Sequence, residues 1–127
     1  MDKVRNYERR REENKNKACM IQDGDSTICI DSSLPILNLI GKKYTMLVLG
    51  VIGNTGKRKN FNEILIDIPF SSSTIISKRL KELQELDLIV KHKGPEGVVY
   101  SLTELGWKVR EMLIPFLRFV ERRSEIP

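Results

Sequence analysis

Apolar and polar residues separate along one segment, SSSTIISKRLKELQEL (residues 71–86), with the period of an α-helix. At 100° per residue its isoleucines and leucines gather on one side and its lysines on the other. The apolar stripe consists of Ile76, Leu80 and Leu83, and the opposite side carries Thr74, Lys78 and Lys81 with Ser77 beside them. The pattern predicts an amphipathic helix with hydroxyl residues at its N-terminus, although any solvated surface helix shows the same division.

Three shorter apolar segments with helical start or stop signals precede this helix. They cover residues 31–41, 42–54 and 61–69. Ser32 or Ser33 is the expected N-cap of the first segment, and Pro69 ends the third. One of the serines at 71–73 is expected to cap the fourth helix, which would stabilise it by about 1 kcal/mol.

The period of the pattern then changes from 3.6 to 2. Two alternating runs flank the turn sequence GPEG and predict a β-hairpin. In its first strand Leu88 and Val90 are expected to face inward, and His92 is expected to face inward with them or to lie at the edge of that face. His92 is interpreted as a packed or surface residue rather than a pH switch. A long helix follows over residues 103–123, with Thr103 as its expected cap and Pro115 as an expected kink or local loosening.

This order of elements predicts a mainly α fold with a small β-hairpin, the winged helix-turn-helix. Residues 71–86 would be the recognition helix, polar toward a DNA groove and apolar behind it. The candidate DNA-binding residues are Ser72, Ser73, Thr74, Ser77, Lys78 and Lys81 on this helix, Lys91 and Lys93 on the wing, and Arg58 and Lys59 in the preceding turn. The lysines and Arg58 would contact phosphates, and Arg79 would either join them or lock the helix to its neighbours.

Charge along the chain suggests how it is organised. The net charge is +5, and residues 1–18 alone hold seven Lys or Arg and four Asp or Glu. We interpret these residues as a charged arm that is either solvated or helical when it docks on a partner surface. Residues 19–127 are expected to form one domain, joined to the arm by a turn-rich connection over residues 20–33. Neither a membrane span nor a signal peptide is apparent, which predicts a cytoplasmic protein with reduced thiols.

The chemistry of an enzyme is missing from the pattern. The sequence has one histidine and shows no glycine-rich phosphate loop, metal-ligand spacing or nucleophile–base arrangement, so neither an enzyme nor a cofactor or metal is expected. The alternative to DNA binding is a winged-helix module that binds protein through its wing or long helix. Whether the protein responds to a small-molecule or oxidant effector is left open by the sequence.

Several of these segments resemble the HxlR-type transcriptional regulators, relatives of the MarR class of winged-helix proteins. The resemblance rests chiefly on SKRLKELQELDLI (residues 77–89) and YSLTELG (residues 100–106) and extends over roughly residues 29–120. It implies a homodimer that binds pseudo-palindromic DNA and dimerises through its terminal helices. Asp87 stands where the family usually has a glycine that ends the recognition helix, so Asp87 must adopt or avoid a left-handed conformation.

Two further expectations concern partners and regulation. The long helix carries more apolar residues than a thin core requires, and the candidate dimer interface comprises Met112, Leu113, Phe116, Leu117 and Val120. Cys29 matches a family cysteine that senses oxidants or electrophiles in some members, which makes it a candidate redox sensor, although a small buried thiol is the commoner use. Cys19 could pair with Cys29 only if the intervening loop folds back.

Overall fold

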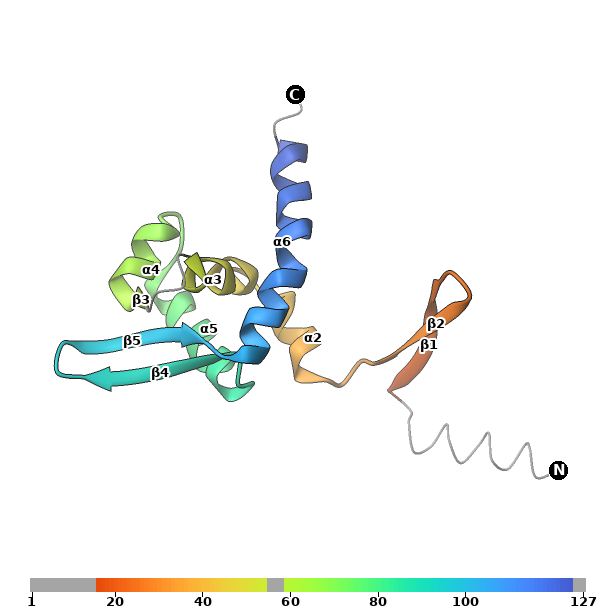
Figure 1. The fold of residues 1–127 in the computed structure, drawn as a ribbon, viewed down its shortest axis with the longest axis horizontal. Coiled ribbons are helices and arrows are strands. Elements are labelled where there is room, and N and C mark those ends of the chain that lie inside the picture. The colour runs from red at the N-terminus through yellow and green to blue at the C-terminus, as the bar shows by residue number, and fades with distance from the viewer. Residues whose placement is uncertain (1–15, 55–58, 125–127) are drawn as a thin grey trace. The chain divides into compact units, whose positions relative to one another are not determined.

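The computed structural model describes residues 16–54 and 59–124 (Figure 1). The chain divides into two compact units, Met1–Asn38 and Leu39–Pro127. Of the arm expected over residues 1–18, only residues 16–18 lie among the described residues. The boundary between the two units falls about twenty residues after the expected end of that arm. In the part of the chain that the structure describes, no helix is both long and apolar enough to cross a bilayer.

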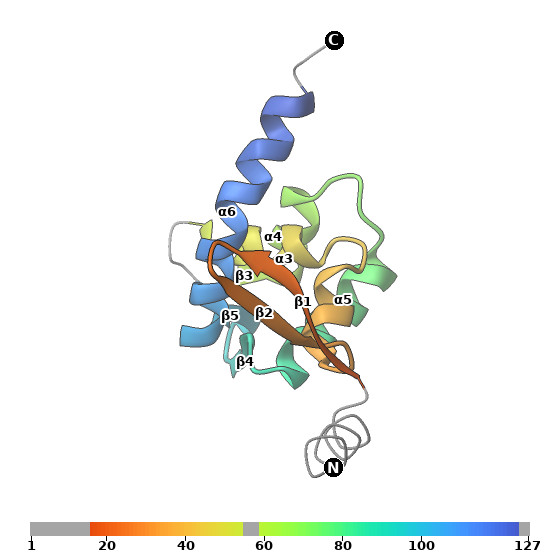
Figure 2. The same cartoon turned by 90° about the vertical axis from the view of Figure 1, so that its right-hand side faces the viewer.

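The first unit contains a β-hairpin that replaces the expected turn-rich connection. Strands β1 (Lys17–Asp23) and β2 (Ser26–Asp31) pair antiparallel around a turn in which Gly24 has a φ of 60° (Figure 2). Cys19 and Cys29 are cross-strand partners and form a disulfide, so the expectation of reduced thiols was wrong. The loop does fold back, because short runs of β-branched and apolar residues flank a two-residue turn of Gly24 and Asp25 that suits a hairpin.

Neither of the serines expected to cap the first helix does so. That helix is α2 (Pro35–Ile40). The Ser33 hydroxyl and amide both donate to a carboxylate oxygen of Asp31, at 2.6 and 2.9 Å, and the Ser32 hydroxyl donates to the carbonyl oxygen of Asn16 at 3.0 Å. The Ser33 hydrogen bonds, with some help from the Lys17 charge, lower the pKa of Asp31. Ser33 is thus engaged in an aspartate-centred turn and Ser32 bonds to the backbone of Asn16, so neither hydroxyl caps the helix.

The second unit has the predicted order of a winged helix. Its elements are the end of α2, α3 (Thr45–Ile52), β3 (Lys59–Asn60), α4 (Phe61–Asp67), α5 (Ser73–Glu85), β4 (Ile89–Gly94), β5 (Gly97–Leu102) and α6 (Glu104–Ser124). The strands form a sheet in the order β3-β5-β4, of which the short β3 was not predicted. The core consists chiefly of Val48, Leu49, Ile52, Ile64, Ile68, Ile76, Leu80, Leu83, Leu88 and Ile89. The predicted mainly helical winged-helix fold is confirmed.

Strand β4 of the wing has the opposite phase from the one expected, whereas Tyr100 and Leu102 of β5 are buried, as their alternation predicts. Ile89 pairs with Leu102 and both are buried, whereas Val90 is 41% exposed. Leu88 is also buried, but it belongs to the turn before the strand, so counting the alternation from Leu88 inverted the two faces. His92 lies at the edge, where its Nε2 is 2.8 Å from the Ser101 hydroxyl.

The turn Asp87–Leu88 connects α5, the wing and α6. Asp87 has a φ of 57°, so it adopts the left-handed conformation that usually favours glycine. The Asp87 amide donates to Gln84 O at 3.0 Å and the Leu88 amide to Leu83 O at 3.0 Å, the two hydrogen bonds of a Schellman motif. The carbonyl groups of the same two residues then accept from Thr103, Asp87 O from its hydroxyl at 2.6 Å and Leu88 O from its amide at 3.1 Å.

Thr103 also caps α6, as predicted. Its hydroxyl oxygen accepts a hydrogen bond from the Gly106 amide at 3.0 Å. Gly106 lies so close to the Leu88 backbone that a Cβ atom would collide with the Leu88 carbonyl oxygen. The helix then continues through Pro115 to Ser124.

We therefore expect Gly106→Ala to lower the free energy of unfolding by more than about 2 kcal/mol, because backbone must move to admit the methyl group. Gly50→Ala is the matched control, since Gly50 lies in α3 with open space around its missing Cβ. That substitution should raise stability by up to about 1 kcal/mol through helix propensity. Urea unfolding of both variants measures the difference, and equal stabilities would show that the α5–α6 contact tolerates a methyl group.

Candidate nucleic-acid interface

Helix α5 buries its apolar stripe and exposes its polar side. Ile76, Leu80 and Leu83 are buried. The six candidate residues on the polar side are all exposed, namely Ser72, Ser73, Thr74, Ser77, Lys78 and Lys81. Ser72 occupies the N-cap position but its hydroxyl makes no capping hydrogen bond, so the expected hydroxyl cap is wrong. The Ser71 hydroxyl instead donates to Ile68 O at 2.6 Å within the preceding turn.

A three-residue ion-pair cluster holds α5 against the turn between α2 and α3. Glu82 accepts from Lys42 Nζ and from Arg79 Nη1, both at 2.6 Å. Arg79 Nε also donates to Lys43 O at 2.9 Å, and its side chain is only 13% exposed. Of the two roles left open for Arg79, the structure supports the lock to neighbouring elements. The hydrogen bond from Lys42, with a further one from Arg79, lowers the pKa of Glu82, so its carboxylate stays ionised.

This cluster leaves two lysines of α5 with their charge available to a partner. Lys78 and Lys81 line a depression together with Lys42, Arg79, Glu82 and Glu85. Glu82 is shared by Lys42 and Arg79, whereas no ion pair joins Lys78 or Lys81 to another described residue. The depression is therefore a place where added negative charge would be attracted.

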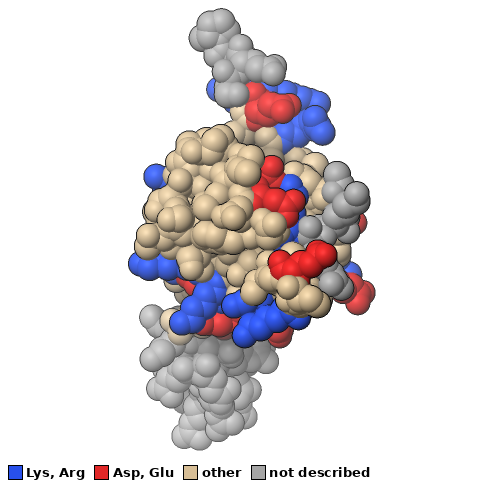
Figure 3. All heavy atoms as spheres, turned by 90° about the vertical axis from the view of Figure 1, so that its left-hand side faces the viewer, with Lys and Arg blue, Asp and Glu red and all other residues tan. Residues whose placement is uncertain are grey.

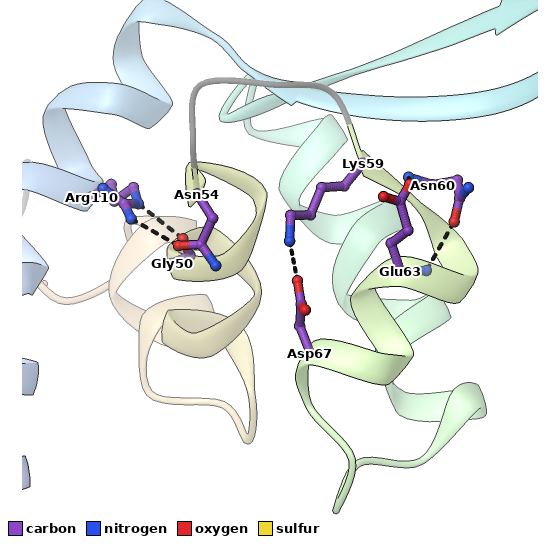
Figure 4. Close-up of polar contacts among 7 residues, drawn as sticks. All are labelled: Gly50, Asn54, Lys59, Asn60, Glu63, Asp67 and Arg110. Carbon is purple, nitrogen blue, oxygen red and sulfur yellow. Dashed lines mark hydrogen bonds and ion pairs between the residues drawn. The ribbon is translucent and has the colours of Figure 1, made fainter.

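The candidate cations outside α5 differ in how available they are. Lys91 and Lys93 are exposed on the wing. Lys59 instead forms an ion pair with Asp67, and its side chain is only 15% exposed (Figure 4). Arg58 lies outside the described residues.

The sequence pattern missed how α4 begins. The Asn60 side chain accepts from the Glu63 amide at 2.8 Å, and the Glu63 carboxylate accepts from the Asn60 amide at 3.0 Å (Figure 4). This reciprocal pair is a capping box, and the spacing of Asn60 and Glu63 was the available signal. It fixes the start of the first helix of the helix-turn-helix.

Helix α6 leaves a long apolar face uncovered. Val109 is its last buried residue, and beyond it the helix extends past the other helices of its unit (Figures 1 and 2). Of the candidate dimer residues, Met112, Phe116 and Val120 are exposed, whereas Leu113 and Leu117 are half-buried. Phe119, 60% exposed, lies on the same face at helical spacing and was missed.

An arginine anchors the first half of α6 to α3. Arg110 Nε donates to Gly50 O at 2.9 Å, and Nη2 donates to Asn54 Oδ1 at 3.3 Å (Figure 4). The Arg110 stem packs where a side chain on Gly53 would otherwise lie. The exposed face of α6 therefore belongs to a helix whose base is firmly attached.

The described residues provide no metal site, since no group of three or more His, Cys, Asp or Glu side chains could hold an ion there. Cys29, the candidate sensor, lies on an exposed strand of the first unit and is bonded to Cys19. What the second unit presents is a polar and basic helix, a basic hairpin and an apolar helix face. These features define a winged helix-turn-helix protein.

Comparisons with known proteins extend this assignment. The model of the HxlR-like helix-turn-helix family matches residues 39–125, and the chain belongs to that family. A possible HxlR family transcriptional factor from Thermoplasma volcanium has a similar structure, with a TM-score of 0.79 and 44% identity over 85% of this chain and 97% of that chain.

A second relative comes from Bacillus subtilis. The HTH-type transcriptional regulator YodB is 36% identical over 72 residues, 54% of this chain and 62% of YodB, so the match spans less than two thirds of that protein. The structure of its reduced form has a TM-score of 0.63 and 26% identity over 79% of this chain and 98% of that chain. These relatives are transcriptional regulators, which agrees with the expectation that the chain is not an enzyme.

Proposed function

We propose that this protein is a sequence-specific transcriptional regulator that inserts α5 into the major groove of duplex DNA. The observation that carries the proposal is the exposed row of hydroxyls and lysines on α5, on a helix fixed by the Glu82 cluster. Short hydroxyls at the N-terminus of a recognition helix reach base edges, and lysines reach phosphates. The family match supports the same function.

The wing supplies positioning contacts in this proposal. Lys91 and Lys93 are exposed and would lie along the phosphate backbone beside the groove that α5 enters. Lys59 is a weaker candidate, because its charge is already satisfied by Asp67 and contact with a phosphate would break that ion pair.

We further propose that the protein acts as a homodimer in the cytoplasm. Burying the face formed by Met112, Phe116, Phe119 and Val120 would remove four large apolar side chains from water. A two-fold axis through this face would present two copies of α5 to half-sites about 34 Å apart, one turn of B-DNA, on a pseudo-palindromic site.

The first test is fluorescence anisotropy of the full chain with random-sequence duplex DNA over a salt series. Log K should fall linearly with log salt, and Lys78→Ala or Lys81→Ala should each weaken binding and reduce the slope by about 0.9. Lys108→Ala, a change on exposed α6, is the matched control and should leave the slope unchanged.

Unchanged binding in both α5 variants would remove that helix from the interface. No binding by the wild type at low salt would instead favour the alternative, a winged-helix module that binds protein.

The second test is the oligomeric state. Sedimentation velocity should give a particle of twice the 14.7-kDa chain mass for the wild type, and Phe116→Glu should dissociate it, because an ionised carboxylate cannot be buried in an apolar interface. Arg118→Ala on the opposite side of α6 serves as the control. A monomeric wild type at tens of micromolar would contradict the proposed dimer.

A second candidate function, redox sensing through Cys29, is supported by its pairing with Cys19. Both cysteines are exposed on the hairpin, so an oxidant can reach them. Oxidation would join the two thiols with loss of two protons and two electrons. YodB, the B. subtilis relative, has been solved in a reduced and a diamide-treated form.

Diamide, which accepts the two electrons and two protons as it becomes a hydrazine, tests this function. The DNA affinity of the wild type should differ by about fivefold or more between its dithiothreitol-reduced and diamide-treated forms, the size of a modest allosteric coupling. Cys19→Ser should abolish the difference. Equal affinities of the two wild-type forms would leave the disulfide a purely structural bond of the hairpin.

A further inference from the structure

An aromatic side chain stands exposed at the entrance to the recognition helix. Phe70 lies in the turn between α4 and α5, two residues before the N-cap Ser72, and is 68% exposed. An exposed phenylalanine forgoes the free energy that burial would give it, and this one directly precedes the serines at 71–73 that lead into the recognition helix.

The turn holds Phe70 rigidly. Pro69 restricts the backbone before it, and both the amide and the hydroxyl of Ser71 donate to Ile68 O, at 3.0 and 2.6 Å. Phe70 is thus the third residue of a hydrogen-bonded turn from Ile68 to Ser71. The turn fixes the backbone from which the ring projects, which lowers the conformational cost of a contact there.

Tyr44 supports Phe70 from the start of α3. The Tyr44 hydroxyl donates to Phe70 O at 3.1 Å, and the two rings pack with centroids 5.9 Å apart at a tilted angle. Lys43 Nζ lies 5.0 Å from the centroid of the Tyr44 ring, while Lys43 O accepts from Arg79 of α5. Phe70 therefore contacts Tyr44, whose neighbour Lys43 binds Arg79 of α5. The ammonium group of Lys43 lies over the Tyr44 ring that supports Phe70.

We propose that Phe70 is a specificity-determining residue that packs against the 5-methyl group of a thymine in each half-site. This inference rests on the proposed insertion of α5 into the major groove. Residues at the N-terminal end of a recognition helix lie at base edges, and the thymine methyl is the apolar feature of the major groove that a phenylalanine can contact.

A protein partner is the other occupant that an apolar patch could have. Ile66, on α4, is 74% exposed, and Figure 3 shows a wide expanse without charged side chains on the side of the molecule where α4 lies. DNA is favoured for Phe70 because its ring packs on Tyr44 and its turn leads directly into the exposed hydroxyl residues of α5. Ile66 lacks this connection, which makes it the matched control.

The test begins with selection of binding sites from a random-sequence duplex library by the full-length wild type. Each thymine of the selected site is then replaced by deoxyuridine, which removes only the methyl group. One thymine in each half-site should be methyl-dependent, and its replacement should weaken wild-type binding about fourfold, the value of one buried methyl group. Phe70→Ala should lose this dependence, whereas Ile66→Ala should keep it.

A second pair of measurements separates this effect from damage to the fold. Phe70→Ala should retain the wild-type salt slope on random duplex, and Phe70→Leu should restore part of the methyl dependence. An unchanged dependence in Phe70→Ala, or a selected site without a methyl-dependent thymine, would overturn the inference and leave the surface to a protein partner. Failure of the wild type to select any site would instead overturn the proposed function itself.

Discussion

The winged helix depends on a two-residue turn, Asp87–Leu88. Its amide groups end α5, its carbonyl groups accept both donors of Thr103, and the backbone of Gly106 packs against it. The end of the recognition helix, the start of the wing and the start of α6 therefore meet at one place. A left-handed aspartate is tolerated there because the two Schellman hydrogen bonds and the buried Leu88 offset its conformational cost.

Local periodicity was sufficient to predict most of the second unit. Helical spacing identified α5 and α6, and a change of period identified the wing. The phase of β4 was wrong because alternation cannot show that Leu88, although buried, precedes the strand. The hairpin of the first unit was missed because its residues are almost all exposed, so no hydrophobic pattern marked it. Strand β3 is two residues long and exists only through its pairing with β5.

The candidate site was predictable as a set of residues but not as a distribution of charge. The sequence places lysines at 59, 78, 81, 91 and 93 without showing which of them meet a carboxylate. Lys59 precedes α4 and Asp67 ends it, and their ion pair removes Lys59 from the available cations. Lys42 reaches Glu82 only through the packing of α5 against the turn between α2 and α3. Arg79 and Glu82, by contrast, stand three residues apart on α5, a spacing that is visible in the sequence. Phe70 was overlooked for a related reason. Its position depends on contact with Tyr44, a residue 26 positions away, as well as on its local turn.

The division into two units has a consequence for how the chain unfolds. The second unit is held by a shared apolar core, which makes its loss of structure cooperative. The hairpin of the first unit has strands that are almost entirely exposed and a covalent bond between them. A two-stranded ribbon is only marginally stable without such a bond. The amide hydrogens of the hairpin should therefore exchange with solvent through local opening, at a rate that depends on whether the disulfide is formed. The amide hydrogens of the helical core should exchange only through global unfolding.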